Sequence, residues 1–259
     1  MLSYNYHTHT YRCGHAIGQD EDYVKAAIQA GYKTLGFSDH APYREYPLKG
    51  THMEWDQLDE YIESINNLKE KYKGIIDIKC GLETEYIEGF LDEKKYLRNK
   101  TDYLILGQHY IDPKGSGNFF GLCTDEHILE YANSVCQAME TGIFTYMCHP
   151  DMFMHKQPGF NDACREASVM IVKKAVETDT PLEINIHGVL RGRWQFSNGL
   201  LYHYPHKDFW KIAGEYGAKC VVGIDAHDPN ELLNAQAFKD GIDELSEFNL
   251  NIINKVELK

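Results

Sequence analysis

The feature that most restricts the fold of this chain is a regular alternation of short apolar runs with stretches of helical periodicity. The apolar runs have the length and composition of β-strands. They cover residues 3–6, 34–38, 75–81, 103–107, 144–148, 181–186 and 219–224, and a weaker run follows residue 249. Strands that alternate with helices form parallel sheets, so we expect an α/β barrel, closed or nearly closed, in one domain over residues 1–259.

The segments between these runs are predicted to be amphipathic helices. In one of them, apolar side chains recur at the spacing of a single helix face: Leu58, Tyr61, Ile62, Ile65 and Leu68. The first connecting helix is expected from about residue 21 to residue 30. It should end at Gly31, because glycine is a common helix C-terminal cap.

Charge and hydropathy exclude several kinds of partner. The net charge is −13 and no cluster of Lys and Arg is present, so a nucleic-acid duplex is not expected to bind. No apolar run approaches the ~20 residues of a membrane-spanning helix, and the N-terminal residues do not have the pattern of a signal peptide. The seven cysteines are scattered without a CxxC pair, which favours reduced thiols in a cytoplasmic protein.

Side chains that bind metals follow every expected strand. In a parallel barrel the carboxyl ends of the strands share one face, which is where active sites lie. The residues at these ends are His7 and His9, Asp39 and His40, Glu83 and Glu85, His109, His149, Glu183 with Asn185 and His187, and Asp225 with His227. We therefore expect these side chains to meet at one rim of the barrel.

The pattern is more specific as a set than in its parts. The pair His7 and His9 places two rings on one face of a strand, as Asp225 and His227 do with mixed donors. A single buried histidine such as His109 is more often structural than a ligand. Structural histidines need not fall at the ends of so many strands, so the set favours a metal site. Imidazole and carboxylate donors suit Zn²⁺, Mn²⁺ or Fe²⁺, and the number of donors exceeds what one tetrahedral ion uses.

These motifs, in this order, resemble those of the polymerase and histidinol phosphatase (PHP) family. The matching segments are His7-Thr8-His9 with His15, Ser38-Asp39-His40, Gly81-Leu82-Glu83, His109, His149-Pro150 and Asp225-Ala226-His227. The resemblance covers nearly the whole chain. The chain length and the segment Ser-Asp-His-Ala-Pro at 38–42 look most like the histidinol-phosphatase branch. One departure is Leu106-Gly107-Gln108-His109, where histidinol phosphatases often have Gly-Ser-Val-His.

The resemblance implies a distorted (β/α)7 TIM-like barrel that holds three divalent transition metals, Zn, Mn or Fe. It assigns the first metal to His7, His9, Glu83 and Asp225. It assigns the second to Glu83, His109 and His149, and the third to His15, His40 and His227. Glu83 would then bridge two ions.

Such a centre suits the hydrolysis of a phosphate ester. Bound ions hold phosphoryl oxygens and lower the pKa of water from ~15.7 toward 7. We expect a hydroxide between the bridged ions to attack phosphorus in line with the leaving alkoxide. The candidate catalytic residues are Glu83, Asp225, His187 and Arg193, and the candidate substrate-binding residues are Arg191, Arg193, His187 and Asp39.

The roles outside the metal ligands have alternatives. Arg191 and Arg193 could grip phosphate through forked hydrogen bonds, or they could be surface arginines. Asp39 could orient a ligand imidazole, or it could cap the end of a strand. Five further histidines are expected to be solvated or structural, and of these His155 is the one expected to face the site if any does: His52, His127, His155, His203 and His206.

The resemblance favours a phosphatase for L-histidinol phosphate, a small phosphorylated substrate of histidine biosynthesis. A related phosphoesterase acting on nucleotides or other small phosphate esters is the first alternative. A non-catalytic barrel is disfavoured because the full set of ligands is present. A metal-dependent amidohydrolase is disfavoured because no lysine stands at a comparable strand end.

Overall fold

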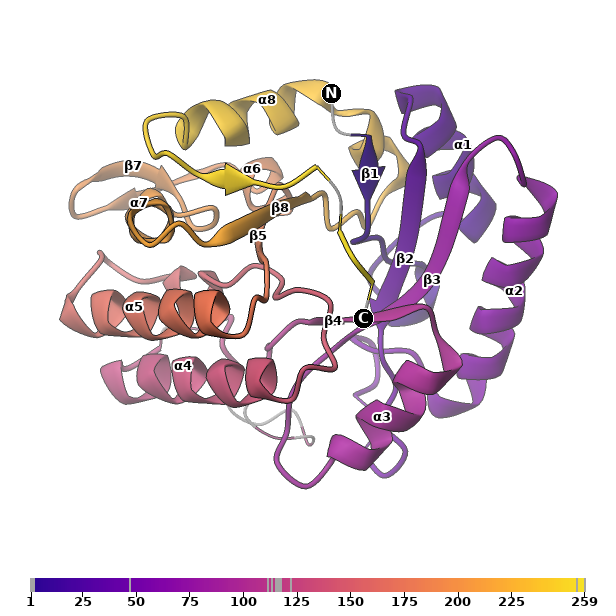
Figure 1. Ribbon diagram of the computed structural model, residues 1–259, viewed down its shortest axis with the longest axis horizontal. Helices are drawn as coiled ribbons and strands as arrows, with labels where there is room; N and C mark the ends of the chain where they lie inside the picture. The colour runs from indigo at the N-terminus through magenta and orange to yellow at the C-terminus, as the bar shows by residue number, and fades with distance from the viewer. Residues whose placement is uncertain are drawn as a thin grey trace.

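The strands form two parallel sheets and one hairpin in the computed structural model, which describes residues 3–46, 48–110, 112, 114, 118–121, 123–254 and 256–258 (Figure 1). The first sheet has the order β1-β2-β3-β4, with bounds Tyr4–Asn5, Thr34–His40, Asp77–Thr84 and Tyr103–Leu106. The second has the order β5-β8-β9, with bounds Leu182–Asn185, Lys219–Gly223 and Asn251–Ile252. The hairpin pairs β6 (Arg193–Phe196) with β7 (Gly199–Tyr202).

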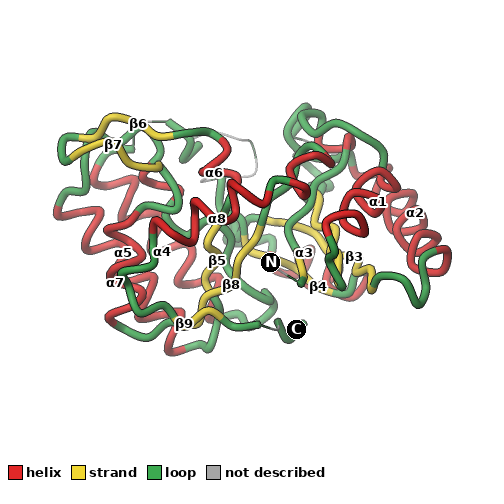
Figure 2. The backbone as a smooth tube through the Cα atoms, turned by 90° about the horizontal axis from the view of Figure 1, so that it is seen from above, coloured by secondary structure: helices red, strands yellow, loops and turns green. Residues whose placement is uncertain are grey.

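Helices surround these strands, as the tube in Figure 2 shows. The α-helices are α1 (Asp20–Ala30), α2 (Leu58–Lys71), α3 (Leu91–Lys100), α4 (Asp125–Glu140), α5 (Asp162–Glu177), α6 (His187–Leu190), α7 (Lys207–Glu215) and α8 (Ala235–Glu244). The 3₁₀ helices are η1 (Tyr11–Cys13), η2 (Trp55–Gln57), η3 (Met152–Met154) and η4 (Pro229–Leu233). The α1 helix ends as predicted, because Gly31 adopts the left-handed conformation that caps it.

Backbone hydrogen bonds link the two sheets on both sides. Residues 145–148 lie between β4 and β5, where Met147 forms parallel bridges with Leu106 and Leu182. On the other side Thr8 pairs with Ala226, beyond the end of β8. The α/β class and a curled parallel sheet are therefore confirmed. The run 144–148, predicted to be a strand, contributes only these isolated bridges, and the β6–β7 hairpin was not predicted.

Two apolar layers hold this arrangement together. The larger layer lies between the sheets and the helices, where the helices turn their apolar faces inward. The smaller layer is built around Tyr103, whose hydroxyl shares its one proton between the carbonyls of Tyr6 and Phe37, at 2.7 and 2.8 Å. These bonds tie β4 to β2 and to the segment after β1, so the ends of three strands are held in register.

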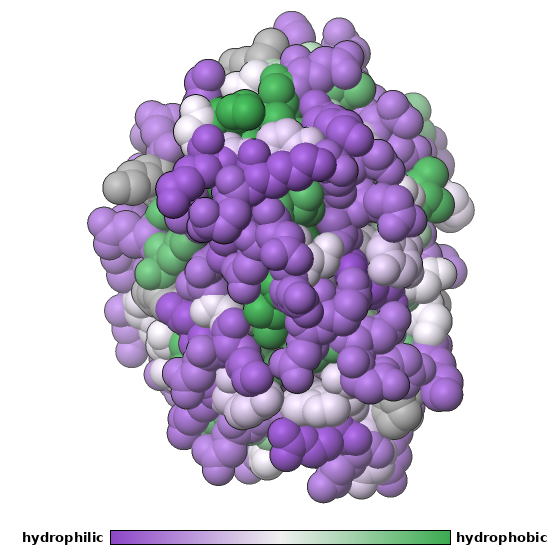
Figure 3. All heavy atoms as spheres, turned by 90° about the vertical axis from the view of Figure 1, so that its right-hand side faces the viewer, coloured by the Kyte–Doolittle hydropathy of each residue, from purple (hydrophilic) through white to green (hydrophobic). Residues whose placement is uncertain are grey.

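The outer faces of the helices are polar. On the side that carries α1 and α2, Figure 3 shows a largely hydrophilic surface with scattered apolar residues. No helix among the described residues has both the length and the apolar character needed to cross a membrane.

Candidate metal centre

Glu83, near the end of β3, lies at the centre of a group of histidines. Its side chain is buried, and its two oxygens face different rings. Imidazole nitrogens lie 3.4, 3.4 and 3.1 Å from Oε2 (His7, His9 and His40) and 3.5 and 2.9 Å from Oε1 (His109 and His149). A carboxylate with donors gathered at each oxygen is arranged to bridge two cations.

Asp225 completes the group on the Oε2 side. Its Oδ1 atom lies 3.4 Å from Nε2 of His7 and 3.0 Å from Nε2 of His9. Asp225 follows β8 and has a positive φ of 54°, which turns its carboxylate away from the direction of the strand. His7, His9, Glu83 and Asp225 thus present four donor atoms to one point.

A third group of donors is formed by His15, His40 and His227. Nε2 of His15 lies 3.1 Å from Nε2 of His227. Each of these two rings places Nδ1 3.0 Å from a backbone carbonyl, that of Cys13 and that of Asp225, so Nδ1 carries the proton in both. Burial lowers the pKa of both rings, that of His227 strongly, so both Nε2 atoms present lone pairs. Two lone pairs at this distance repel each other, whereas a cation between them would be attracted by both.

The same outward orientation of Nδ1 recurs in the deeper rings. Nδ1 of His7 lies 2.9 Å from Glu183, and Nδ1 of His109 lies 2.9 Å from Glu85. A carboxylate accepts the Nδ1 proton in each case, so Nε2 is the nitrogen that faces the centre and would bind a metal. Metal-binding histidines are commonly oriented by such partners.

The atoms that face the centre are unsatisfied within the described part of the chain. Five buried atoms there form no hydrogen bond: His7 Nε2, His9 Nε2, His40 Nδ1, Glu83 Oε2 and Asp225 Oδ1. Buried polar groups without partners are costly and rare. Their convergence fits transition-metal ions, which accept imidazole and carboxylate donors together.

The electrostatics of the group also favour a cation. Burial alone would raise the pKa of Glu83 and Asp225, but the surrounding imidazoles hold both well below their usual range. Burial alone would lower the pKa of His9, but Asp225 and Asp39 raise it to about 9. Protons on the histidines neutralise the carboxylates in this way, and a metal ion would take the place of those protons.

Two glycines make room for the carboxylates. A Cβ atom added to Gly107 would collide with Oε1 of Glu83, and one added to Gly223 would collide with Oε1 of Glu183. Gly107 directly follows β4, which pairs with the strand of Glu83, and Gly223 ends β8, which pairs with the strand of Glu183. The bridge and the carboxylate behind His7 therefore each need an adjacent position without a side chain.

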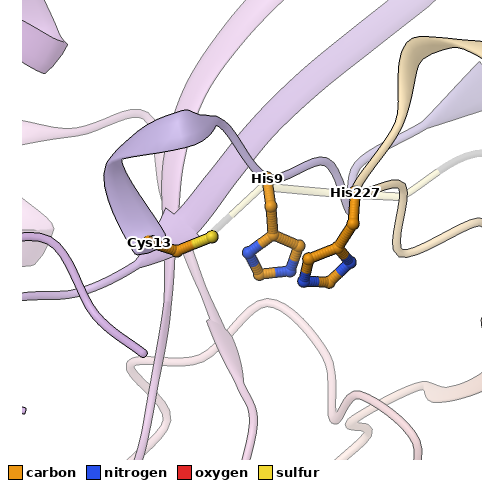
Figure 4. A group of neighbouring side chains, drawn as sticks. All are labelled: His9, Cys13 and His227. Atoms are coloured by element: carbon orange, nitrogen blue, oxygen red, sulfur yellow. The ribbon is translucent and has the colours of Figure 1, made fainter. Parts of the chain in front are cut away.

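Cys13 lies close to the centre without serving as a good ligand. Figure 4 shows its sulfur pointing at the ring of His9, which stacks on His227 with 4.1 Å between ring centroids. The thiol is fully buried and donates to the carbonyl of Thr10 at 3.2 Å. Burial raises its pKa far above the usual thiol value, so it stays protonated and binds metals weakly. This geometry agrees with the expectation that the cysteines are reduced thiols.

A cavity of about 180 Å³ opens onto the cluster. The donors Glu83, Asp225, His15, His40, His109, His149 and His227 line it, together with Phe120, Met152, His187, Arg191 and Tyr204. A second cavity of about 250 Å³ shares part of this wall and is also lined by His52 and Tyr110. Two of the expected substrate residues, His187 and Arg191, are thus at the site.

Arg193 is not brought to this cavity, contrary to the sequence expectation. It begins β6, and its guanidinium pairs with Glu244 of α8 at 2.7 Å and stacks on Tyr202. Arg191 precedes the strand and turns toward the cluster instead. The hairpin, which the sequence pattern did not reveal, directs these two arginines differently.

Asp39 does not take the candidate role of a substrate-binding residue, and its position fits the alternative role, which is to orient a ligand imidazole. It is fully buried behind His9, with Oδ1 3.6 Å from Nδ1 of that ring. Its other oxygen accepts from the hydroxyl of Thr10, which Arg12 also contacts. Asp39 therefore orients His9, and it does not line the cavity.

Three buried residues of the site were missed as partners of the ligands. Glu183 and Glu85 were noted only as strand-end carboxylates, and His52 was expected to be solvated or structural. His52 is 4% exposed and contacts Glu85 at 3.2 Å. The sequence did contain a sign of these partners, because Glu83 and Glu85 are two residues apart. This spacing does not show which of the two carboxylates faces a metal and which faces a histidine ring.

Comparisons with known proteins identify the family. The model of the PHP domain matches residues 5–187. A Deinococcus radiodurans protein named "Probable histidinol-phosphatase" is 30% identical over 247 residues, covering 92% of this chain and 91% of its own length. The Bacillus subtilis histidinol-phosphatase is 32% identical over 144 residues, covering 52% of this chain and 53% of its own.

A solved structure shares the fold over the full length. The histidinol phosphate phosphatase of Lactococcus lactis, determined with zinc, L-histidinol and phosphate, superposes with a TM-score of 0.73 at 19% identity. The match covers 99% of this chain and 100% of that protein. With a family model matched over most of its residues and a relative at 30% identity along nearly all of its length, this chain belongs to the PHP domain family.

Proposed function

We propose that this protein is a metal-dependent phosphomonoesterase that hydrolyses L-histidinol phosphate to histidinol and phosphate. The observation that carries the proposal is the position of Glu83 at the wall of a cavity, where its two oxygens face separate groups of imidazole nitrogens and the nitrogens beside Oε2 form no hydrogen bond. The named relatives are histidinol-phosphatases, which supports the choice of substrate.

The proposed centre holds three divalent ions, of zinc, manganese or iron. His7, His9, Glu83 and Asp225 would hold the first, and Glu83, His109 and His149 the second. His15, His40 and His227 would hold the third. The distances among these donor atoms, 2.9–3.5 Å, support the grouping.

When bound, such ions supply positive charge for the phosphoryl oxygens and lower the pKa of a water molecule so that it can attack phosphorus. Around them, the protein positions and dehydrates the substrate. Arg191 has a planar guanidinium suited to two phosphate oxygens at once. Burial lowers the pKa of His187 to about 4, so its ring is neutral near pH 7. A neutral ring donates one N–H to a phosphate oxygen and is a poor source of a proton for the leaving alkoxide.

We also interpret the whole of residues 1–259 as one distorted seven-stranded β/α barrel. The bridges at Met147 and Ala226 support this, because they connect the two sheets on both sides. We place the enzyme in the cytoplasm, where a small phosphorylated metabolite is available. The seven cysteines are all unpaired, as expected in a reducing compartment.

The substrate is tested by comparing phosphate release from histidinol phosphate with release from a panel of phosphomonoesters and nucleotides, using enzyme supplied with zinc or manganese. We expect kcat/KM to be highest for histidinol phosphate. A higher value for a nucleotide or another small ester would reject the proposed substrate. No turnover of any ester would reject the enzymatic function.

Replacing Glu83 by Gln should reduce kcat more than replacing any ligand that would touch a single ion. The amide keeps the shape of the side chain and loses its charge, so two ions are held less well. Loss of a partner outside the ligand shell costs about 10–100-fold, so we expect more than that for Glu83→Gln. His15→Ala is the control, because His15 is exposed at the rim. Equal effects of the two changes on kcat and metal content would contradict the bridging role.

The two arginines provide a matched pair of variants. Arg191→Ala should lower kcat/KM by about 10- to 150-fold at unchanged metal content, since a charge-assisted hydrogen bond is worth about 1.5–3 kcal/mol. Arg193→Ala should leave kcat/KM near the wild-type value, because Arg193 pairs with Glu244 away from the cavity. Lys at position 191 should restore only part of the loss. The reverse order of the two alanine variants would show that Arg191 is misassigned.

A further inference from the structure

Glu85 is a buried carboxylate that serves several elements of the barrel at once. Its Oε1 atom lies 2.9 Å from Nδ1 of His109 and 3.2 Å from Nε2 of His52. Its Oε2 atom accepts a hydrogen bond of 2.8 Å from the hydroxyl of Tyr43. His109 follows β4, Tyr43 follows β2, and His52 lies in the loop before η2. Glu85 itself follows β3. Its side chain is inaccessible to solvent, so these partners take the place of water around the carboxylate.

Tyr43 is in turn held on its far side. Nζ of Lys94, on α3, lies 3.8 Å from the centroid of the phenol ring and is almost fully buried. A cation over an aromatic face is attracted to it, more strongly where water is excluded. Within the described residues, this ammonium group forms no hydrogen bond. The ring of Tyr43 is therefore fixed between Lys94 and the carboxylate of Glu85.

The contacts of Glu85 determine how His109 presents itself to the centre. An ionised carboxylate is only an acceptor, so Nδ1 of His109 keeps its proton, and Nε2 is the nitrogen that faces Oε1 of Glu83 and would bind a metal. The rings of His15 and His227 are oriented differently, by backbone carbonyls. Tyr43 is joined to a candidate ligand by hydrogen bonds through Glu85, and its other contact on this side is between its ring and that of His52, with 5.9 Å between the centroids. Because the hydrogen bonds lead to His109, the effect of Tyr43 should fall on the ion that His109 would bind.

We propose that Tyr43 is a positioning residue that, by fixing Glu85, sets the affinity of the one metal site that uses His109. The proposal rests on the metal centre of the proposed function. Tyr43 neither lines the cavity beside Glu83 nor offers an atom to a metal. It acts from behind the ligand, through two hydrogen bonds in series.

The test is a titration of the metal-free full-length chain with Zn²⁺, in which each binding step is resolved by competition with a chromophoric chelator. Tyr43→Phe should weaken one step by about 10- to 100-fold and leave the other steps unchanged. Glu85→Gln should weaken the same step at least as much. Because Tyr43 acts through Glu85, Tyr43→Phe should add nothing in the Glu85→Gln background.

Tyr4→Phe is the matched control. Tyr4 is also buried and donates one hydroxyl hydrogen bond, of 2.7 Å, to the carbonyl of Ile253, which is not a candidate ligand or a partner of one. Its removal should leave all zinc steps unchanged. Unchanged steps in Tyr43→Phe, or an equal weakening of all of them, would overturn the proposal.

Parallel assays of histidinol phosphate hydrolysis separate this proposal from the proposed function. Turnover by the wild type together with unchanged zinc steps in Tyr43→Phe would overturn the positioning role alone. A selective loss of one step, with no turnover of any ester by the wild type, would support the positioning role and overturn the enzymatic function.

Discussion

The rest of this structure depends on one constraint, which is that two carboxylates, Glu83 and Asp225, are buried together among histidines. A buried charge is costly unless it is paired. No lysine or arginine within the described residues forms an ion pair with either carboxylate. Their partners are imidazoles, together with the side-chain amide of Asn185, which donates to Asp225 at 3.1 Å. Such an arrangement is stable with protons or metal ions at the centre. Much of the neighbouring structure, including Gly107 and Gly223, is arranged to keep these groups close together.

The rings around the carboxylates are supported in two ways. His7 and His109 donate Nδ1–H to the carboxylates of Glu183 and Glu85, whereas His15 and His227 donate to backbone carbonyls. A carboxylate partner makes the ring a stronger ligand than a carbonyl does. The proposed sites on either side of Glu83 should therefore bind ions more tightly than the site at the exposed rim. An unequal centre of this kind would keep two ions in place while the third exchanges more readily.

Sequence reasoning predicted the α/β class and the group of candidate ligands because both follow from simple geometry. The carboxyl ends of parallel strands meet, and period two places His7 with His9 on one face. What it could not predict depends on the direction of single side chains beyond a strand end. Arg191 and Arg193 are two residues apart, yet an unpredicted hairpin sends Arg193 to Glu244. Asp39 and Glu85 have the same chemistry as the central carboxylates, and only the fold shows that they lie behind the rings.

The segment 144–148 illustrates the limit for strands. Its composition is that of a strand, and it does lie between β4 and β5, but it forms isolated bridges in place of a ladder. The pairing of a strand depends on the register and twist of both neighbours, which no local pattern contains. The third strand also ends three residues later than predicted. Leu82, Glu83 and Thr84 do not extend the apolar run as a group, but all three pair with β4, and the first two also pair with β2.

We propose that Glu83 bridges two ions in a centre of three. The most direct test is anomalous diffraction from crystals grown with zinc, recorded on both sides of the zinc absorption edge. The account predicts strong peaks beside each oxygen of Glu83, one near His7, His9 and Asp225 and one near His109 and His149. A weaker peak is predicted between His15 and His227. Peaks confined to the protein surface, or a single peak that Glu83 does not contact, would contradict it.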